Sequence, residues 1–160
     1  MNYFLQFLAS TFATIGFGFT FSCPKKAIVF GGISGGIAWV IFQVIKSEFD
    51  SIYWGNFIGA FTVGILGEFF ARKFEIPSSV FIIPAITTLV PGAGMYYTMN
   101  YFVQGKQNLV STTLQQTLII AGILAFGLLI SSASSRSLRN FKMRKDIKFD
   151  YRKFIKRKEK

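Results

Sequence analysis

Long apolar segments separated by short polar turns dominate this chain. Four of them are continuous, at residues 3–22, 27–45, 52–71 and 109–131. A fifth, residues 76–102, is equally apolar but is interrupted by prolines and glycines. Because a membrane-spanning helix needs roughly 20 mostly apolar residues, the pattern predicts an all-α integral membrane protein with five transmembrane helices. Residues 1–131 would form the transmembrane bundle, followed by a basic cytoplasmic tail at residues 132–160.

The fourth predicted span should contain a broken helix. Pro84 and Pro91 each lack a backbone donor and clash with the carbonyl four residues earlier, so the carbonyls of Val80 and Thr87 should lose their helical partners. In hydrocarbon such a break is tolerated where packed protein or a watery cavity takes over the freed groups. Broken helices often mark binding sites in secondary transporters. The alternative is a kinked helix without a ligand, since Gly and Pro are common in transmembrane helices.

The distribution of basic residues predicts the orientation in the membrane. All but two of the 18 Lys and Arg residues fall on one side of a five-span arrangement, and the exceptions are Lys46 and Lys106. Cytoplasmic segments are enriched in Lys and Arg. We therefore expect a multi-pass protein of the plasma (inner) membrane with its N-terminus outside and its C-terminus in the cytoplasm.

The tail at residues 136–160 accounts for most of the net charge of +11. Its basic residues alternate with aromatic ones, a composition that also occurs in nucleic-acid-binding segments. A basic segment that directly follows a membrane span has a simpler partner, because anionic lipids of the inner leaflet attract it. The expected partners of the tail are these lipids or another protein, and no nucleic acid.

Small residues spaced four apart predict close helix packing. The second span carries such pairs at Gly31/Gly35 and Gly32/Gly36, and the third at Gly55/Gly59. This spacing lets two helix backbones approach closely in a membrane. The contacting helices could belong to this chain or to another.

Few side chains offer chemistry inside the predicted spans. Glu68 is the only carboxylate in a span and lies four residues before Arg72. The two side chains could form an ion pair near the helix end, or Glu68 could carry a coupling proton in a cavity. The chain has no His and a single Cys, and it lacks the motifs of soluble hydrolases and of intramembrane proteases. We expect no enzyme, no cofactor and no metal site.

Three stretches resemble the threonine/serine exporter family, in particular its small-subunit or C-terminal module (the YjjB-like group). The most specific is PAITTLVPGAGMYYTM at residues 84–99, which resembles the proline–glycine motif of that family. Residues 16–39 are similar to its first hairpin, and residues 67–81 to its Glu-x-x-Ala-Arg stretch. The resemblance covers roughly residues 10–130.

The resemblance implies export of small polar carboxylates, such as threonine and serine or dicarboxylates such as succinate. It also implies that this module works with a larger membrane subunit. Physical reasoning agrees, because alternating access usually needs two repeats or bundles around a central site, and the five spans offer only one. Two alternatives remain: a non-transporting scaffold subunit, and a self-sufficient homo-oligomeric carrier or channel.

The broken helix suggests how a substrate would bind. A half-helix beginning near Gly94 would present free amides at the positive end of its dipole, which can hold a carboxylate. Glycine at positions 92 and 94 would leave room for close approach, and threonine and tyrosine hydroxyls could bind the other polar groups of the substrate. The candidate substrate-binding residues are Thr87, Thr88, Pro91, Gly92, Ala93, Gly94, Met95 and Tyr96.

Overall fold

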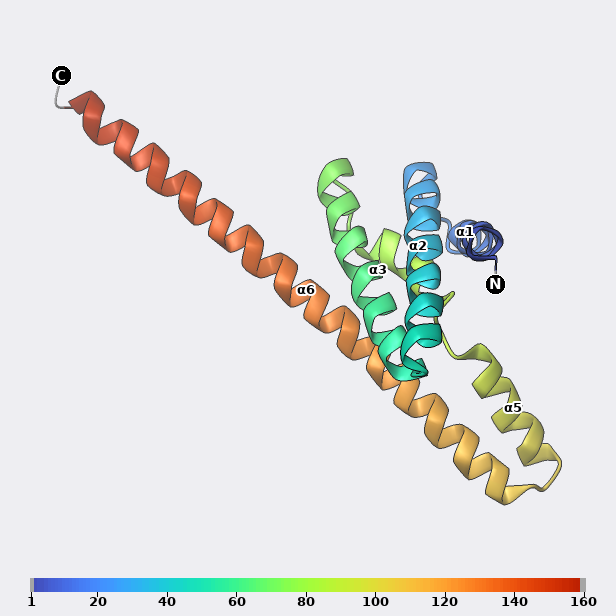
Figure 1. The fold of residues 1–160 in the computed structure, drawn as a ribbon. Coiled ribbons are helices and arrows are strands. Elements are labelled where there is room, and N and C mark those ends of the chain that lie inside the picture. Colours follow the sequence, from blue (N-terminus) through green and yellow to red (C-terminus); the bar gives the residue numbers. More distant parts are fainter. Residues whose placement is uncertain (1, 159–160) are drawn as a thin grey trace.

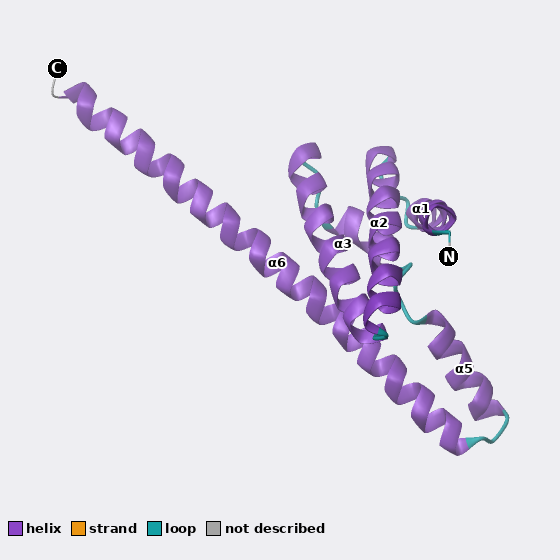
Figure 2. Ribbon diagram, viewed as in Figure 1, coloured by secondary structure: helices purple, strands orange, loops and turns teal. Residues whose placement is uncertain are grey.

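The structure is a computed structural model that describes the backbone of residues 2–158 and the side chains of residues 2–135. The described chain contains six helices and no strand (Figures 1 and 2). This confirms the predicted all-helical class. The helices are α1 (Tyr3–Thr20), α2 (Lys25–Phe49), α3 (Ile52–Phe74), α4 (Ser79–Ile86), α5 (Gly92–Val103) and α6 (Gln107–Lys158).

Helices α1 and α2 pack as an antiparallel hairpin. The hydroxyls of Tyr3 and Ser47 lie 3.3 Å apart near one end, and Gly18 lies against Ile28 near the other. The buried residues of α1 are small or polar, whereas most of its large apolar side chains point outward. Phe7 and Ile15 are exceptions, because they pack against Gly36 and Gly32 of α2. Such an arrangement suits a helix surrounded by lipid, where helices associate through small residues rather than through the hydrophobic effect. The buried residues of α1 are Ser10, Thr14 and Gly18, and the exposed ones include Phe4, Leu5, Phe12 and Phe19.

Small residues also position α3 and α6. Gly55 lies against Phe42 of α2, and Gly64 lies against Ser131 of α6. Helix α6 crosses α3 obliquely and continues well beyond it (Figure 1). The core formed at this junction draws on four elements and the segment after α4. Its members are Ala38, Phe42, Ala60, Val63, Ala85, Leu89, Ile120 and Leu124.

Three helices are long and apolar enough to cross a membrane by length and composition. They are α2, α3 and the part of α6 from Gln107 to Ser135. Helix α1 has 18 residues, near the lower limit for a span, and α4 and α5, with 8 and 12 residues, are each too short to cross alone. Four of the five expected segments therefore coincide with single helices, and the fifth is divided between α4 and α5. The count of five crossings stays a prediction.

The position of the interruption corrects one expectation. Pro84 lies inside α4 instead of breaking it, and the helix ends only at Ile86. The non-helical segment covers residues 87–91, and α5 begins at Gly92 rather than near Gly94. Pro84 is tolerated because the carbonyl of Val80, which it cannot pair with, accepts a hydrogen bond from the Cys23 thiol at 3.6 Å. A turn distant in sequence thus supplies the missing donor.

Basic residues gather at one end of the bundle. Arg72 donates a hydrogen bond from Nη2 to the carbonyl of Ser135 at 2.8 Å, which places the start of the tail beside the end of α3. Lys26 of α2 lies over the ring of Phe74 at the same end. We call this region, formed by Lys25, Lys26, Arg72, Lys73 and Ser135, the basic end. The side chains expected to bind lipid, at residues 136–160, lie outside the described part, although the helix backbone continues to Lys158.

Candidate functional site

The break between α4 and α5 begins inside the bundle. Helix α4 packs on α1, α2 and α3, whereas α5 packs on α6 alone among the described helices. Leu89, within the break, is 4% exposed and lies against Gly59 of α3. The chain therefore leaves the bundle core at residues 87–91 and continues as a separate helix along α6 (Figure 1).

The N-terminus of α5 has free amides. The amide of Gly92 donates to the carbonyl of Val90 at 2.7 Å, and that of Met95 donates to the carbonyl of Pro91 at 3.1 Å. No side chain caps this helix, and within the described chain the amides of Ala93 and Gly94 have no backbone acceptor. Two donors thus remain at the positive end of the helix dipole, where an anion is stabilised.

The two glycines of the motif have different surroundings. A β-carbon at position 92 would meet no atom within 4 Å, so the space beside Gly92 is open. A β-carbon at position 94 would collide with the hydroxyl of Thr117 on α6. Gly92 therefore fits the expected role of leaving room for a ligand, whereas Gly94 allows α5 to pack closely on α6.

The two threonines use their hydroxyl protons within α4. The hydroxyl of Thr88 donates to the carbonyl of Ala85 at 2.9 Å, and that of Thr87 donates to the carbonyl of Pro84. Each hydroxyl oxygen can still accept a hydrogen bond. The threonines are therefore suited to accept from an ammonium or hydroxyl group, and they would have to reorient to donate to a carboxylate.

Met95 and Tyr96 lie on the exposed surface of α5, which has no buried residue. The ring of Tyr96 contacts Tyr97, with 5.5 Å between the ring centroids. The role of Tyr96 in substrate binding stays a prediction. Its exposed side chain is available to a partner or to lipid.

Glu68 and Arg72 form an ion pair away from the break. Their charged atoms lie 3.9 Å apart, and the side chain of Glu68 is 22% exposed. Glu68 follows Gly59, the residue that contacts the break, by more than two turns of α3, which is about 13 Å along the helix axis. The structure thus places Glu68 at the basic end and separates it from the candidate substrate-binding residues.

Thr117, the residue against which Gly94 packs, is not singled out by the sequence pattern. It is 5% exposed, and its hydroxyl donates to the carbonyl of Thr113 at 2.7 Å. A threonine within an apolar span is a weak signal, since its proton is satisfied by the preceding turn. Only the pairing of α5 with α6 reveals its importance.

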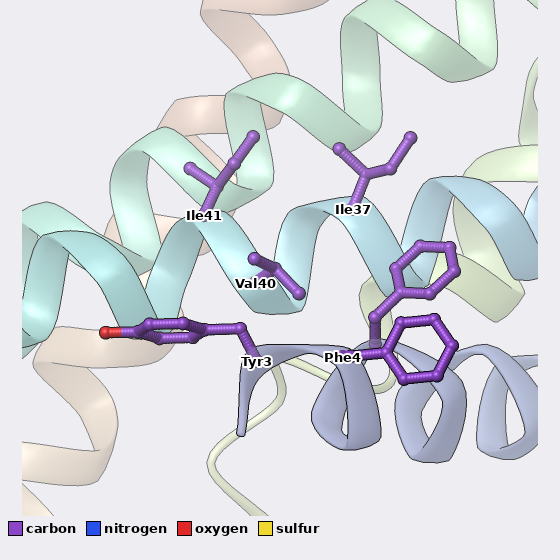
Figure 3. A pocket seen from close by; sticks show the side chains of 6 residues that line it. Tyr3, Phe4, Ile37, Val40 and Ile41 are labelled. Carbon is purple, nitrogen blue, oxygen red and sulfur yellow. The ribbon is translucent and has the colours of Figure 1, made fainter. Parts of the chain in front are cut away.

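Two cavities lie elsewhere in the described part of the chain. One, of about 330 Å³, lies between α1 and α2, and its lining is almost wholly apolar (Figure 3). The other, of about 430 Å³, lies at the α5–α6 turn, from Gly105 to Leu109. Within the described residues, no three potential ligands among His, Cys, Asp and Glu come together to hold a metal ion.

Comparison with known proteins identifies the family. The model of the family described as "Threonine/Serine exporter, ThrE" matches residues 6–134, which include all six helices up to the start of the basic tail. No solved structure matches the chain. Because the match covers most of the chain and includes the broken segment, the protein belongs to the threonine/serine exporter family.

Proposed function

We propose that this chain is the small subunit of a membrane exporter for small polar carboxylates. The substrates would be threonine and serine, or dicarboxylates such as succinate. The observation that carries the proposal is the uncapped start of α5, where the amides of Ala93 and Gly94 lack backbone acceptors beside the open space at Gly92. Family membership supplies the direction of transport.

Substrate binding would combine two kinds of hydrogen bond. The free amides of α5 would hold the carboxylate of the substrate, which needs no Lys or Arg at the break. The hydroxyl oxygens of Thr87 and Thr88 would accept from the amino or hydroxyl group. Glycine at position 92 would let the carboxylate approach the backbone.

Five membrane crossings are part of this proposal. Helices α4 and α5 would together make the fourth crossing, since their 8 and 12 residues give a combined length of about 30 Å. The hydrogen-bonded pair Tyr3 and Ser47 lies at the end of the α1–α2 hairpin that is remote from Lys26. The N-terminus is therefore at the opposite end of the bundle from the basic end, where the tail begins, and this supports an odd number of crossings. By the distribution of basic residues, the basic end would face the cytoplasm.

A larger membrane subunit would complete the transport path. Among the described helices, α5 packs on α6 alone, and its exposed residues include Met95, Tyr96, Met99 and Phe102. A second bundle seated against α5 would enclose the break between two moving parts, as alternating access requires. A homo-oligomeric carrier would use a second copy of this chain instead.

A scaffold subunit without a transport path is the second candidate function. It is favoured by the packing of Gly94 on Thr117. In that case the family motif would serve helix packing alone.

Reconstitution distinguishes these functions. Three preparations of proteoliposomes are compared. The first contains this chain alone, the second contains this chain with the larger subunit, and the third contains the Gly92→Val variant of this chain with the larger subunit. Flux of labelled threonine, serine and succinate is then measured. We expect flux only when both subunits are present and a large loss with Gly92→Val. Full flux from the larger subunit with Gly92→Val would support the scaffold, and flux from this chain alone would support the homo-oligomer.

A further inference from the structure

Two lysines from different turns approach one aromatic ring at the basic end. The ammonium nitrogen of Lys26 lies 5.8 Å from the centroid of the Phe74 ring, and that of Lys73 lies 5.9 Å from it. The ring belongs to an aromatic cluster at the ends of α2, α3 and α4, so its position is fixed by packing. Its neighbours Phe30, Phe70 and Phe81 have centroids 4.6, 6.4 and 6.3 Å away.

The positive charge at this ring has no partner within the described chain. The ion pair found there joins Glu68 to Arg72, and neither Lys26 nor Lys73 pairs with a carboxylate. Because the two ammonium groups lie 5.8 and 5.9 Å from the same ring centroid, both positive charges are held in one small region of the basic end.

The N-terminus of α2 adds to this field. The helix begins at Lys25 without a side-chain cap, and its first turn contains no acidic residue. The positive end of the dipole of this 25-residue helix is therefore not neutralised by its own first turn. Two lysines held near the same ring beside such a terminus would be stabilised by an anion placed between them.

We propose that Lys26 and Lys73, seated on the Phe74 ring, bind the phosphate group of an anionic phospholipid. A phosphate diester offers oxygens to both ammonium groups and to the first amides of α2. The exposed ring of Phe69 and the half-buried rings of Phe30, Phe70 and Phe74 offer apolar surface near the lysines, which acyl chains could contact. This site differs from the tail, because it is built from the two turns that flank α2 and α3.

A lipid fits this site better than free phosphate does. Phe74 and Phe30 are half-buried, and Phe69 on the same helix end is 58% exposed, so apolar surface adjoins the lysines. Free phosphate would gain nothing from that surface. A lipid headgroup would gain both charge pairing and contact with the rings.

Lipid binding to the purified full chain in nonionic detergent tests the site. Native mass spectrometry and thermal melting are carried out with phosphatidylglycerol, with phosphatidylcholine and with inorganic phosphate. We expect phosphatidylglycerol to bind most strongly and to raise the melting temperature most. Lys26→Ala and Lys73→Ala should each weaken its binding roughly fivefold, the effect of one basic side chain near an anionic headgroup. Phe74→Leu should also weaken it, because both lysines lose their shared support.

Lys46 provides the matched control. Its ammonium group lies 6.0 Å from the Phe42 ring, but it lies alone and at the opposite end of α2. The tail is identical in all variants, so it contributes the same background binding. Unchanged binding in Lys26→Ala and Lys73→Ala, or an equal loss in Lys46→Ala, would overturn the proposal. An equal stabilisation by inorganic phosphate would show that the ligand is the free ion and not a lipid.

Discussion

Arg72 joins two helices, because it pairs with Glu68 on α3 and donates a hydrogen bond to the carbonyl of Ser135 on α6. The ion pair measures 3.9 Å and the hydrogen bond 2.8 Å. The side chain of Arg72 is 48% exposed, so solvent screens the ion pair, which should contribute less than about 1 kcal/mol. The hydrogen bond to Ser135 does not depend on the ionisation of Glu68.

This arrangement predicts different results for substitutions of Glu68 and of Arg72. Glu68→Gln should leave abundance nearly unchanged and should keep the pH dependence of transport, whereas Arg72→Gln should lower abundance because α6 loses a contact. Quantitative immunoblotting of membranes and flux across a pH series measure both effects. A flattened pH profile in Glu68→Gln at full abundance would instead assign the coupling proton to this carboxylate.

Position 94 should be sensitive to packing and not only to substrate. Gly94→Ala places a methyl group against the Thr117 hydroxyl and should destabilise the contact of α5 with α6 by about 1–3 kcal/mol. Thr117→Ala removes the colliding group, so the double variant should recover most of the loss. Thermal melting of the two single variants and the double variant forms the test, and a loss that simply adds would disprove this contact.

Pro91 should keep the break open. Pro91→Ala supplies an amide that can pair with the Thr87 carbonyl and lets α5 extend backward into the break. We expect near-normal membrane insertion and a marked loss of transport, measured as flux at equal protein level. Val103→Ala, at the exposed far end of α5, serves as a control and should transport almost normally.

Cys23 should react slowly with maleimides at neutral pH. Burial raises the pKa of its thiol, so the reactive thiolate forms only at higher pH than in an ordinary cysteine. The labelling rate of the native protein should therefore rise with pH beyond the range where a free thiol levels off. The reference is the pH profile of labelling of the unfolded chain, whose thiol has its usual pKa. An identical pH profile in the native protein would contradict the prediction.

The hydrogen bond from Cys23 should also matter for stability. Cys23→Ala leaves the Val80 carbonyl without its donor and should cost about 1 kcal/mol, whereas Cys23→Ser keeps a donor and should cost less. Thermal melting compares the two. Equal losses would mean that the size of the side chain, and not its donor, is what stabilises the turn.

Accessibility of single cysteines tests the membrane orientation. In a Cys23→Ser background, Lys106→Cys should react with an impermeant reagent from outside the cell, and Lys148→Cys only after the membrane is opened. Reaction of both from the same side would exclude five crossings.

Hydropathy and turn residues are local properties of the sequence, so they predict well which segments form helices. The interruption after residue 86 follows from Pro91 and Gly92, which lie side by side in sequence. The continuity of α4 through Pro84 could not be predicted, because it depends on a thiol 57 residues away. The packing of Gly94 on Thr117 could likewise not be predicted, since nothing near Gly94 in sequence indicates that Thr117 will lie against it.

In α1 the small side chains are buried and most large apolar ones are exposed, and this has a consequence for which substitutions the helix tolerates. In a water-soluble protein, large apolar positions are the least tolerant of exchange. Here Phe4, Phe12 and Phe19 face outward, and any apolar residue of similar size should replace them, whereas Ser10 and Thr14 sit where no larger group fits. A saturation library of α1 should therefore show its strictest selection at the smallest side chains.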